Sequence, residues 1–82
     1  MRVFHIIEQT ADQQVIEIRT HTMEQAIQVY AQTALVNEPI EQIYWVNNNT
    51  VQIYANDEVC TVRVHSGGRI AYAQWTHNKG LY

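Results

Sequence analysis

The sequence predicts an α+β fold in which one helix packs on one face of an antiparallel sheet of five to six strands. Two periodicities predict this fold. Hydrophobic and polar residues alternate in several short segments, which is typical of half-buried strands, whereas in one segment only they recur at steps of three and four, as on one side of a helix. The 82 residues show no compositional boundary and no internal repeat, so we expect a single domain over residues 1–82.

The first two strands are expected at residues 3–9 and 15–19. The first segment is rich in β-branched and aromatic residues, which favour strands. In the second, Ile16 and Ile18 alternate with Glu17 and Arg19, so its hydrophobic residues share one face. The polar break between the two segments predicts a turn, and the pair is therefore expected to form an antiparallel hairpin.

The helix is expected at residues 23–36. Its hydrophobic stripe consists of Met23, Ala26, Ile27, Tyr30, Ala31, Ala34 and Leu35. Thr22 stands at the N-cap position with Gln25 three residues later, which is the spacing of a capping box. Pro39 disfavours helical backbone at the residue before it, so the helix should end by Glu38.

Four further strands are expected after the helix, which gives the order β-β-α-β-β-β-β. They lie at residues 40–46, 50–55, 59–65 and 69–76, with turns at 47–49, 56–57 and 66–68 and a tail at 77–82. A single amphipathic helix covers one face of such a sheet, so the other face must meet solvent or a partner.

The composition excludes several classes of protein. One cysteine permits neither an internal disulfide framework nor a cysteine-rich zinc site. No hydrophobic run approaches the roughly 20 residues of a transmembrane helix, and the first residues do not resemble a signal peptide. We therefore expect a cytoplasmic protein without a membrane partner.

Side chains that could support catalysis are scattered along the chain. The four histidines lack the short spacing of a zinc site, and Cys60 alternates in phase with Val62 and Val64, as a buried thiol would. A catalytic thiol would need a base such as His5 or His65, and His65 falls on the opposite face of the same expected strand. We expect neither an enzyme nor a bound metal or cofactor.

The charge balance disfavours a nucleic-acid partner. Five Lys and Arg residues stand against eight Asp and Glu residues, for a net charge of −3, whereas affinity for a phosphate backbone comes chiefly from Lys and Arg. Arg19 and Arg63 could share a patch with Tyr54 and Trp75 on which single-stranded bases stack, and this remains the nucleic-acid alternative.

The uncovered sheet face is the expected binding surface. Tyr, Trp and Arg are enriched at the energetic centres of protein interfaces, and Lys is depleted there. The candidate binding residues are Arg19, Gln52, Tyr54, Arg63, His65 and Trp75, and Tyr72 replaces Trp75 if the last strand has the opposite phase. These residues could instead be ordinary strand residues facing solvent. A second alternative is a homodimer that buries the same face against its own copy.

The arrangement of the chain resembles that of small phage-encoded anti-CRISPR proteins, in particular type I inhibitors with one helix on an antiparallel sheet. The likeness consists of a strand at residues 1–7, a passage from strand to capped helix at residues 17–26, and short hairpins with a late Trp75. It implies a non-catalytic inhibitor in the host cytoplasm that binds a host protein complex and obstructs DNA recognition or nuclease recruitment. No binding residue is carried over, since the chain offers neither a strongly acidic nor a Lys-rich surface.

Overall fold

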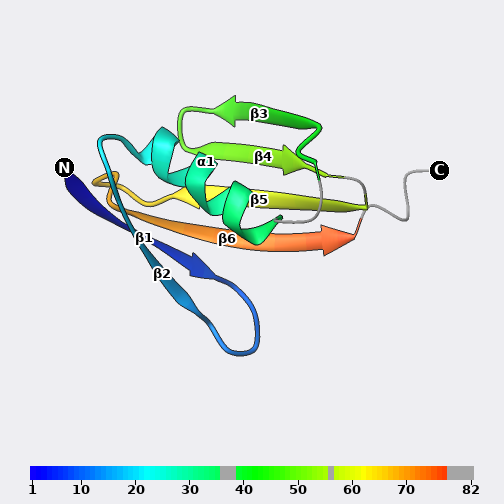
Figure 1. The fold of residues 1–82 in the computed structure, drawn as a ribbon, viewed down its shortest axis with the longest axis horizontal. Helices are drawn as coiled ribbons and strands as arrows, with labels where there is room; N and C mark the ends of the chain where they lie inside the picture. The colour runs from blue at the N-terminus through cyan, green and yellow to red at the C-terminus, as the bar shows by residue number, and fades with distance from the viewer. Residues whose placement is uncertain (36–38, 56, 78–82) are drawn as a thin grey trace.

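The computed structural model describes residues 1–35, 39–55 and 57–77. It contains one helix and six strands, as the sequence predicts, in an α+β arrangement (Figure 1). In chain order the elements are β1 (Arg2–Glu8), β2 (Val15–Thr20), α1 (Met23–Ala34), β3 (Gln42–Asn47), β4 (Thr50–Tyr54), β5 (Glu58–Val64) and β6 (Ile70–His77). Among the described residues, no helix is long and apolar enough to cross a membrane.

The six strands form one sheet in the spatial order β2-β1-β6-β5-β4-β3. Four neighbouring pairs are antiparallel, but β1 and β6 run parallel, with Ile6 beside Ala71 and Ile7 beside Tyr72. The expectation of a purely antiparallel sheet is therefore wrong, and the sheet is mixed. The cause is the helical crossover: α1 returns the chain so that β2 and β3 run in the same direction, and the alternation from β3 to β6 then makes β6 parallel to β1.

Helix α1 begins where the capping residues predict. The hydroxyl oxygen of Thr22 accepts a hydrogen bond from the Gln25 backbone N–H over 3.2 Å, and Gln25 Oε1 accepts one from the His21 backbone N–H over 3.2 Å. In a standard capping box the Gln25 side chain would accept from the Thr22 backbone N–H, but here it accepts from the backbone N–H of His21, one residue earlier. The helix ends at Ala34, and the predicted end at Val36 lies outside the described residues.

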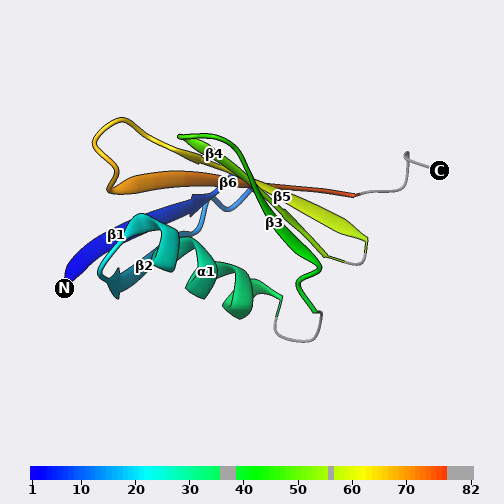
Figure 2. The same cartoon turned by 90° about the horizontal axis from the view of Figure 1, so that it is seen from above.

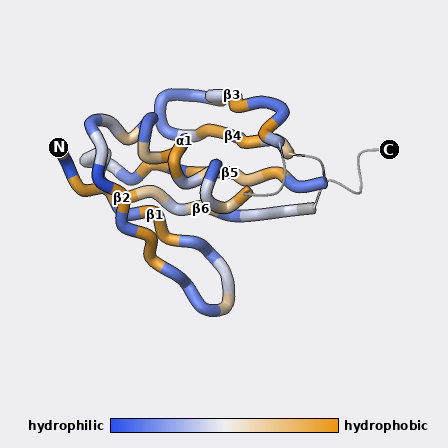
Figure 3. The backbone as a smooth tube through the Cα atoms, viewed as in Figure 1, coloured by the Kyte–Doolittle hydropathy of each residue, from blue (hydrophilic) through white to orange (hydrophobic). Residues whose placement is uncertain are grey.

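A single-layer core lies between α1 and the sheet. The helix contributes Ala26, Ile27, Tyr30 and Ala31, with Leu35 just beyond its end, whereas Ala34 is exposed, contrary to the predicted stripe. The strands contribute Phe4, Ile6, Ile18, Val51, Ile53, Ala55, Cys60, Val62, Ala71 and Ala73. Figure 2 shows α1 on one side of the sheet only, and Figure 3 shows hydrophobic stretches in the strands separated by hydrophilic connections.

Two predicted connections fall partly outside the described residues. The turn at 56–57 includes Asn56, and the tail at 77–82 includes residues 78–82, so neither is described in full. His77, which was assigned to the tail, belongs to β6. The turn at 66–68 is present between β5 and β6, where Gly67 and Gly68 have φ angles of 102° and 73°. Such positive φ angles favour glycine, as the sequence suggested.

Candidate protein-binding surface

The face of the sheet turned away from α1, here called the open face, is defined by the alternation within each strand. In β5, Cys60 and Val62 are buried under the helix, so Thr61 and Arg63 point the other way. The same alternation places Gln52 and Tyr54 of β4 and Tyr72 of β6 on the open face. No described open-face residue is buried, which is consistent with helical cover on the opposite side only.

Four of the six predicted binding residues lie on the open face along β4, β5 and the turn after β5. They are spread along these strands, since Tyr54 lies opposite Val59 whereas Arg63 lies opposite Thr50. Gln52 lies directly opposite Thr61, and Tyr54 donates its hydroxyl to Gln52 Oε1 over 2.8 Å. Arg63 follows Thr61 by two residues and therefore lies on the same face. His65 comes just after β5. We call Gln52, Tyr54, Thr61, Arg63, His65 and Tyr72 the open-face patch.

Tyr72, and not Trp75, is the aromatic residue of β6 that belongs to the open-face patch. It lies directly opposite Arg63 on one side and beside Ile7 of β1 on the other. Its ring meets that of His65 edge-on, with centroids 6.4 Å apart and planes at 66°. Ala71 and Ala73 are both buried on the helix side, so Tyr72, which stands between them in the sequence, points to the open face.

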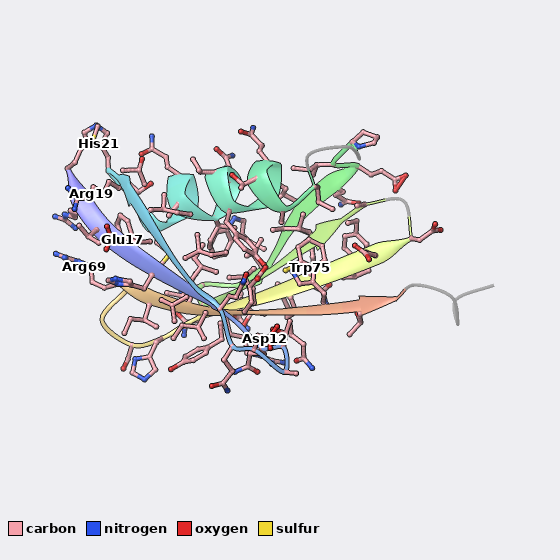
Figure 4. All side chains as sticks on the ribbon, turned by 60° about the horizontal axis from the view of Figure 1, so that its bottom comes forward. Asp12, Glu17, Arg19, His21, Arg69 and Trp75 are labelled. Carbon is pink, nitrogen blue, oxygen red and sulfur yellow. The ribbon has the colours of Figure 1, made fainter. Side chains whose placement is uncertain are left out.

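Trp75 does not belong to the open face, and its predicted placement there is wrong. Its residue number is in phase with Ala71 and Ala73, and it lies opposite buried Cys60 (Figure 4). The indole Nε1 donates to the Tyr30 hydroxyl oxygen over 2.8 Å, and that hydroxyl donates to Glu8 Oε2 over 2.6 Å. Trp75 therefore holds the helix onto the sheet.

Arg19 lies on the open face but outside the open-face patch. It is on β2, three strands away from β5, which corresponds to about 14 Å at the usual strand spacing. Its Nε donates to Glu17 Oε2 over 3.4 Å, and Glu17 Oε1 is 3.7 Å from His5 Nε2. Figure 4 shows Arg19, Glu17, His21 and Arg69 gathered at one end of the molecule. Arg19, Tyr54 and Trp75 therefore do not form the shared surface that the nucleic-acid alternative requires.

The electrostatics of the open face differ from those of the whole chain. The net charge is −3, yet Glu17 is the only carboxylate among the described strand residues of this face, and it lies beside Arg19 rather than Arg63. Within the open-face patch, Arg63 is the one permanent charge. The patch can therefore donate hydrogen bonds to acidic side chains or carbonyl groups on another surface.

The Cys60 thiol and the Tyr30 hydroxyl, which lie between α1 and the sheet, are protonated at neutral pH. Burial raises the pKa of the Cys60 thiol to about 12. Burial, followed by the hydrogen bond to Glu8, raises the pKa of Tyr30 far above its ordinary value. Both groups stay protonated, so neither supplies a nucleophile or a base. Over residues 1–35, 39–55 and 57–77, no group of three or more His, Cys, Asp or Glu side chains could hold a metal ion.

Comparison of the chain with protein families, with curated proteins and with solved structures found no match. The geometry of the described residues is therefore the basis for a functional proposal.

Proposed function

We propose that this chain is a non-enzymatic protein-binding module that inhibits a host protein complex by covering part of its surface. The observation that carries the proposal is the uncovered sheet face, on which Arg63 and Tyr72 lie directly opposite each other on the two central strands, β5 and β6. The open-face patch contains one Arg and two Tyr residues, which belong to the residue types that dominate binding energy at protein interfaces.

Four of the six residues of the open-face patch are restrained by their neighbours before any partner arrives. Tyr54 is held by its hydrogen bond to Gln52, and Tyr72 is flanked by His65 and Ile7. Gln52, Tyr54, Thr61 and Tyr72 are each half-buried by their neighbours. Side chains that are already restrained lose less conformational entropy on binding, so more of the contact energy remains as affinity.

The polarity of the same surface favours a partner of another kind over permanent burial against a second copy. The central row across β4, β5 and β6 consists of Gln52, Thr61 and Gln74, all of which are polar. Permanent homodimer interfaces are more hydrophobic than this, resembling a divided core. A partner that offers carboxylates and backbone carbonyls would satisfy Arg63 and the amides.

The resemblance to type I anti-CRISPR proteins suggests the class of partner. Such a role requires only tight occupation of a site on the surveillance complex and no chemical step, in the cytoplasm of the host cell. Cys60 and Tyr30 are buried and protonated, which is compatible with a protein that binds a partner without a chemical step.

A phage-challenge assay tests the proposed function. The chain is expressed in bacteria whose type I CRISPR system targets an infecting phage, and plaques are counted. We expect the wild-type chain to restore plaque formation and the double variant Arg63→Ala/Tyr72→Ala to lose most of that effect. The control Gln28→Ala/Gln32→Ala changes two exposed residues on the outer side of α1 and should act as the wild type. Full CRISPR protection in the presence of the wild-type chain would contradict this function.

A further inference from the structure

The two edge strands of the sheet, β2 and β3, differ in the charged residues that they carry. Within the described residues, β2 pairs only with β1, and β3 pairs only with β4, so each has one unpaired side. β2 carries Glu17 and Arg19, and charged side chains on an edge strand discourage pairing with another chain. β3 has the sequence QIYWVN and carries no charge and no proline. The β3 edge therefore lacks the charged side chains that protect β2, and its one irregularity is the register shift between Trp45 and Asn47.

The exposed side chains of β3 are large and hydrophobic on both faces. Tyr44, Trp45 and Val46 are 51%, 38% and 48% exposed, and they are consecutive. Tyr44 lies on the open face because it is opposite Gln52, whereas Trp45 is opposite buried Val51 and faces the helix side. Helix α1 does not cover Trp45, which borders an open hollow together with Glu24, Asn47 and Asn48.

We propose that β3 pairs with β3 of a second copy of this chain, in antiparallel orientation, to form one continuous twelve-stranded sheet. A two-fold axis perpendicular to the sheet keeps both helices on the same side, so residues directly opposite each other must share a face. Centred on Tyr44, this pairing sets Tyr44 opposite its own copy and Ile43 opposite Trp45 of the other protomer. Aromatic pairs and aromatic–aliphatic pairs are among the favourable cross-strand contacts.

The self-pairing meets no electrostatic obstacle. β3 contributes no charge, so no like charges oppose each other between the two pairing strands. The register shift between Trp45 and Asn47 is at the end of β3, so residues 42–45 keep regular strand pairing. The second copy is therefore a complementary occupant for this edge.

The dimer goes beyond the proposed function and has a consequence for it. Because the axis is perpendicular to the sheet, the two open faces point in the same direction. A dimer would present two open-face patches side by side, which raises avidity for a partner that carries two matching sites.

Mass measurement by light scattering after size-exclusion chromatography tests the dimer. We expect the wild type to have twice the mass of the 9.6 kDa chain. Tyr44→Lys and Trp45→Lys place like charges in the pairing strand on the open and helix sides respectively. Each should weaken the dimer at least about tenfold. Val15→Lys introduces the same charge at an exposed residue of the β2 edge and should leave the dimer intact, as should Arg63→Ala/Tyr72→Ala.

Several outcomes would overturn the dimer. A monomeric wild type at concentrations up to about 1 mM would do so. So would dissociation by Tyr44→Lys but not by Trp45→Lys, which would indicate packing of the open faces. Hydrogen exchange provides a second measurement: β3 amides should gain protection as concentration rises, and β2 amides should not. Equal behaviour of both edges would contradict the pairing. None of these results depends on the phage-challenge assay, so the two proposals can fail separately.

Discussion

Trp75 and Tyr30 are joined by a hydrogen bond of 2.8 Å from the indole Nε1 to the phenolic oxygen, with their rings tilted by 47° and their centroids 6.3 Å apart. Tyr30 passes the connection on to Glu8 over 2.6 Å. These three residues come from β6, α1 and β1. They therefore fasten the helix to the sheet where the parallel strands β1 and β6 meet, which is where the N-terminal hairpin joins the other four strands.

Removing the Tyr30 hydroxyl should destabilise the protein noticeably. Tyr30→Phe leaves the Trp75 N–H without its partner in a partly buried setting, and such a loss costs about 1–3 kcal/mol. Urea unfolding followed by tryptophan fluorescence measures the change. Gln28→Ala, on the exposed side of the same helix, serves as the control and should change stability by no more than about 0.5 kcal/mol. Equal stability of the two variants would mean that the chain of hydrogen bonds contributes nothing.

Alkaline solution should weaken the fold through Cys60. The unfolded thiol loses its proton near about pH 8.5, whereas the folded thiol has a pKa of about 12. Between these values the unfolded state binds fewer protons, so the free energy of unfolding falls as the pH rises. From pH 8 to pH 10 we expect the wild type to lose about 2 kcal/mol more than Cys60→Ala. Tyr30, which titrates in the same direction, is common to both proteins. Parallel pH profiles would contradict the buried, neutral thiol.

The accessibility of Cys60 gives an independent check. The folded protein should react with a thiol-specific disulfide reagent only as fast as it unfolds, since the side chain is fully buried. A matched comparison is Thr61→Cys in the Cys60→Ala background, which moves the thiol to the open face of the same strand. This variant should react far faster without urea. Similar rates for both thiols would place Cys60 at the surface.

The turn between β5 and β6 should tolerate asparagine better than alanine. Gly68 has a φ of 73°, and a Cβ placed there meets no atom within 4 Å, so any cost comes from the backbone alone. Gly68→Ala should cost about 1–2 kcal/mol and Gly68→Asn less, because asparagine adopts positive φ more readily. Ser66→Ala is the neutral comparison. Thermal unfolding should rank the variants in this order, and a reversal of alanine and asparagine would contradict it.

Periodicity in the sequence located the strands and the helix but left their neighbours open. Thr22 and Gln25 interact with each other within one helical turn, so the sequence alone predicts where α1 begins. The pairing of Ile6 with Ala71 joins residues far apart in the chain, and alternation within each strand carries no information about which strand lies beside it. The parallel pair therefore emerged only from the fold.

The candidate site was recovered in part for a similar reason. Arg63 and Tyr54 belong to strands with clear hydrophobic alternation, which fixed their face. In β6 the buried residues Ala71 and Ala73 are small, and each face carries one large aromatic residue, Tyr72 or Trp75. The hydrophobic pattern therefore does not show which of the two faces the helix. Arg19 was assigned to the correct face, but strand order, which the sequence does not contain, separates it from the open-face patch.

The most direct test of the central claim is the affinity of the purified chain for a purified type I surveillance complex, measured by titration with three proteins. We expect Arg63→Ala/Tyr72→Ala to weaken binding by at least about thirtyfold, since two central interface residues commonly cost more than 2 kcal/mol together. Gln28→Ala/Gln32→Ala should bind like the wild type, and circular dichroism should show the same fold for all three. Binding that is unchanged in the Arg63→Ala/Tyr72→Ala variant would contradict the claim that the open face is the docking surface.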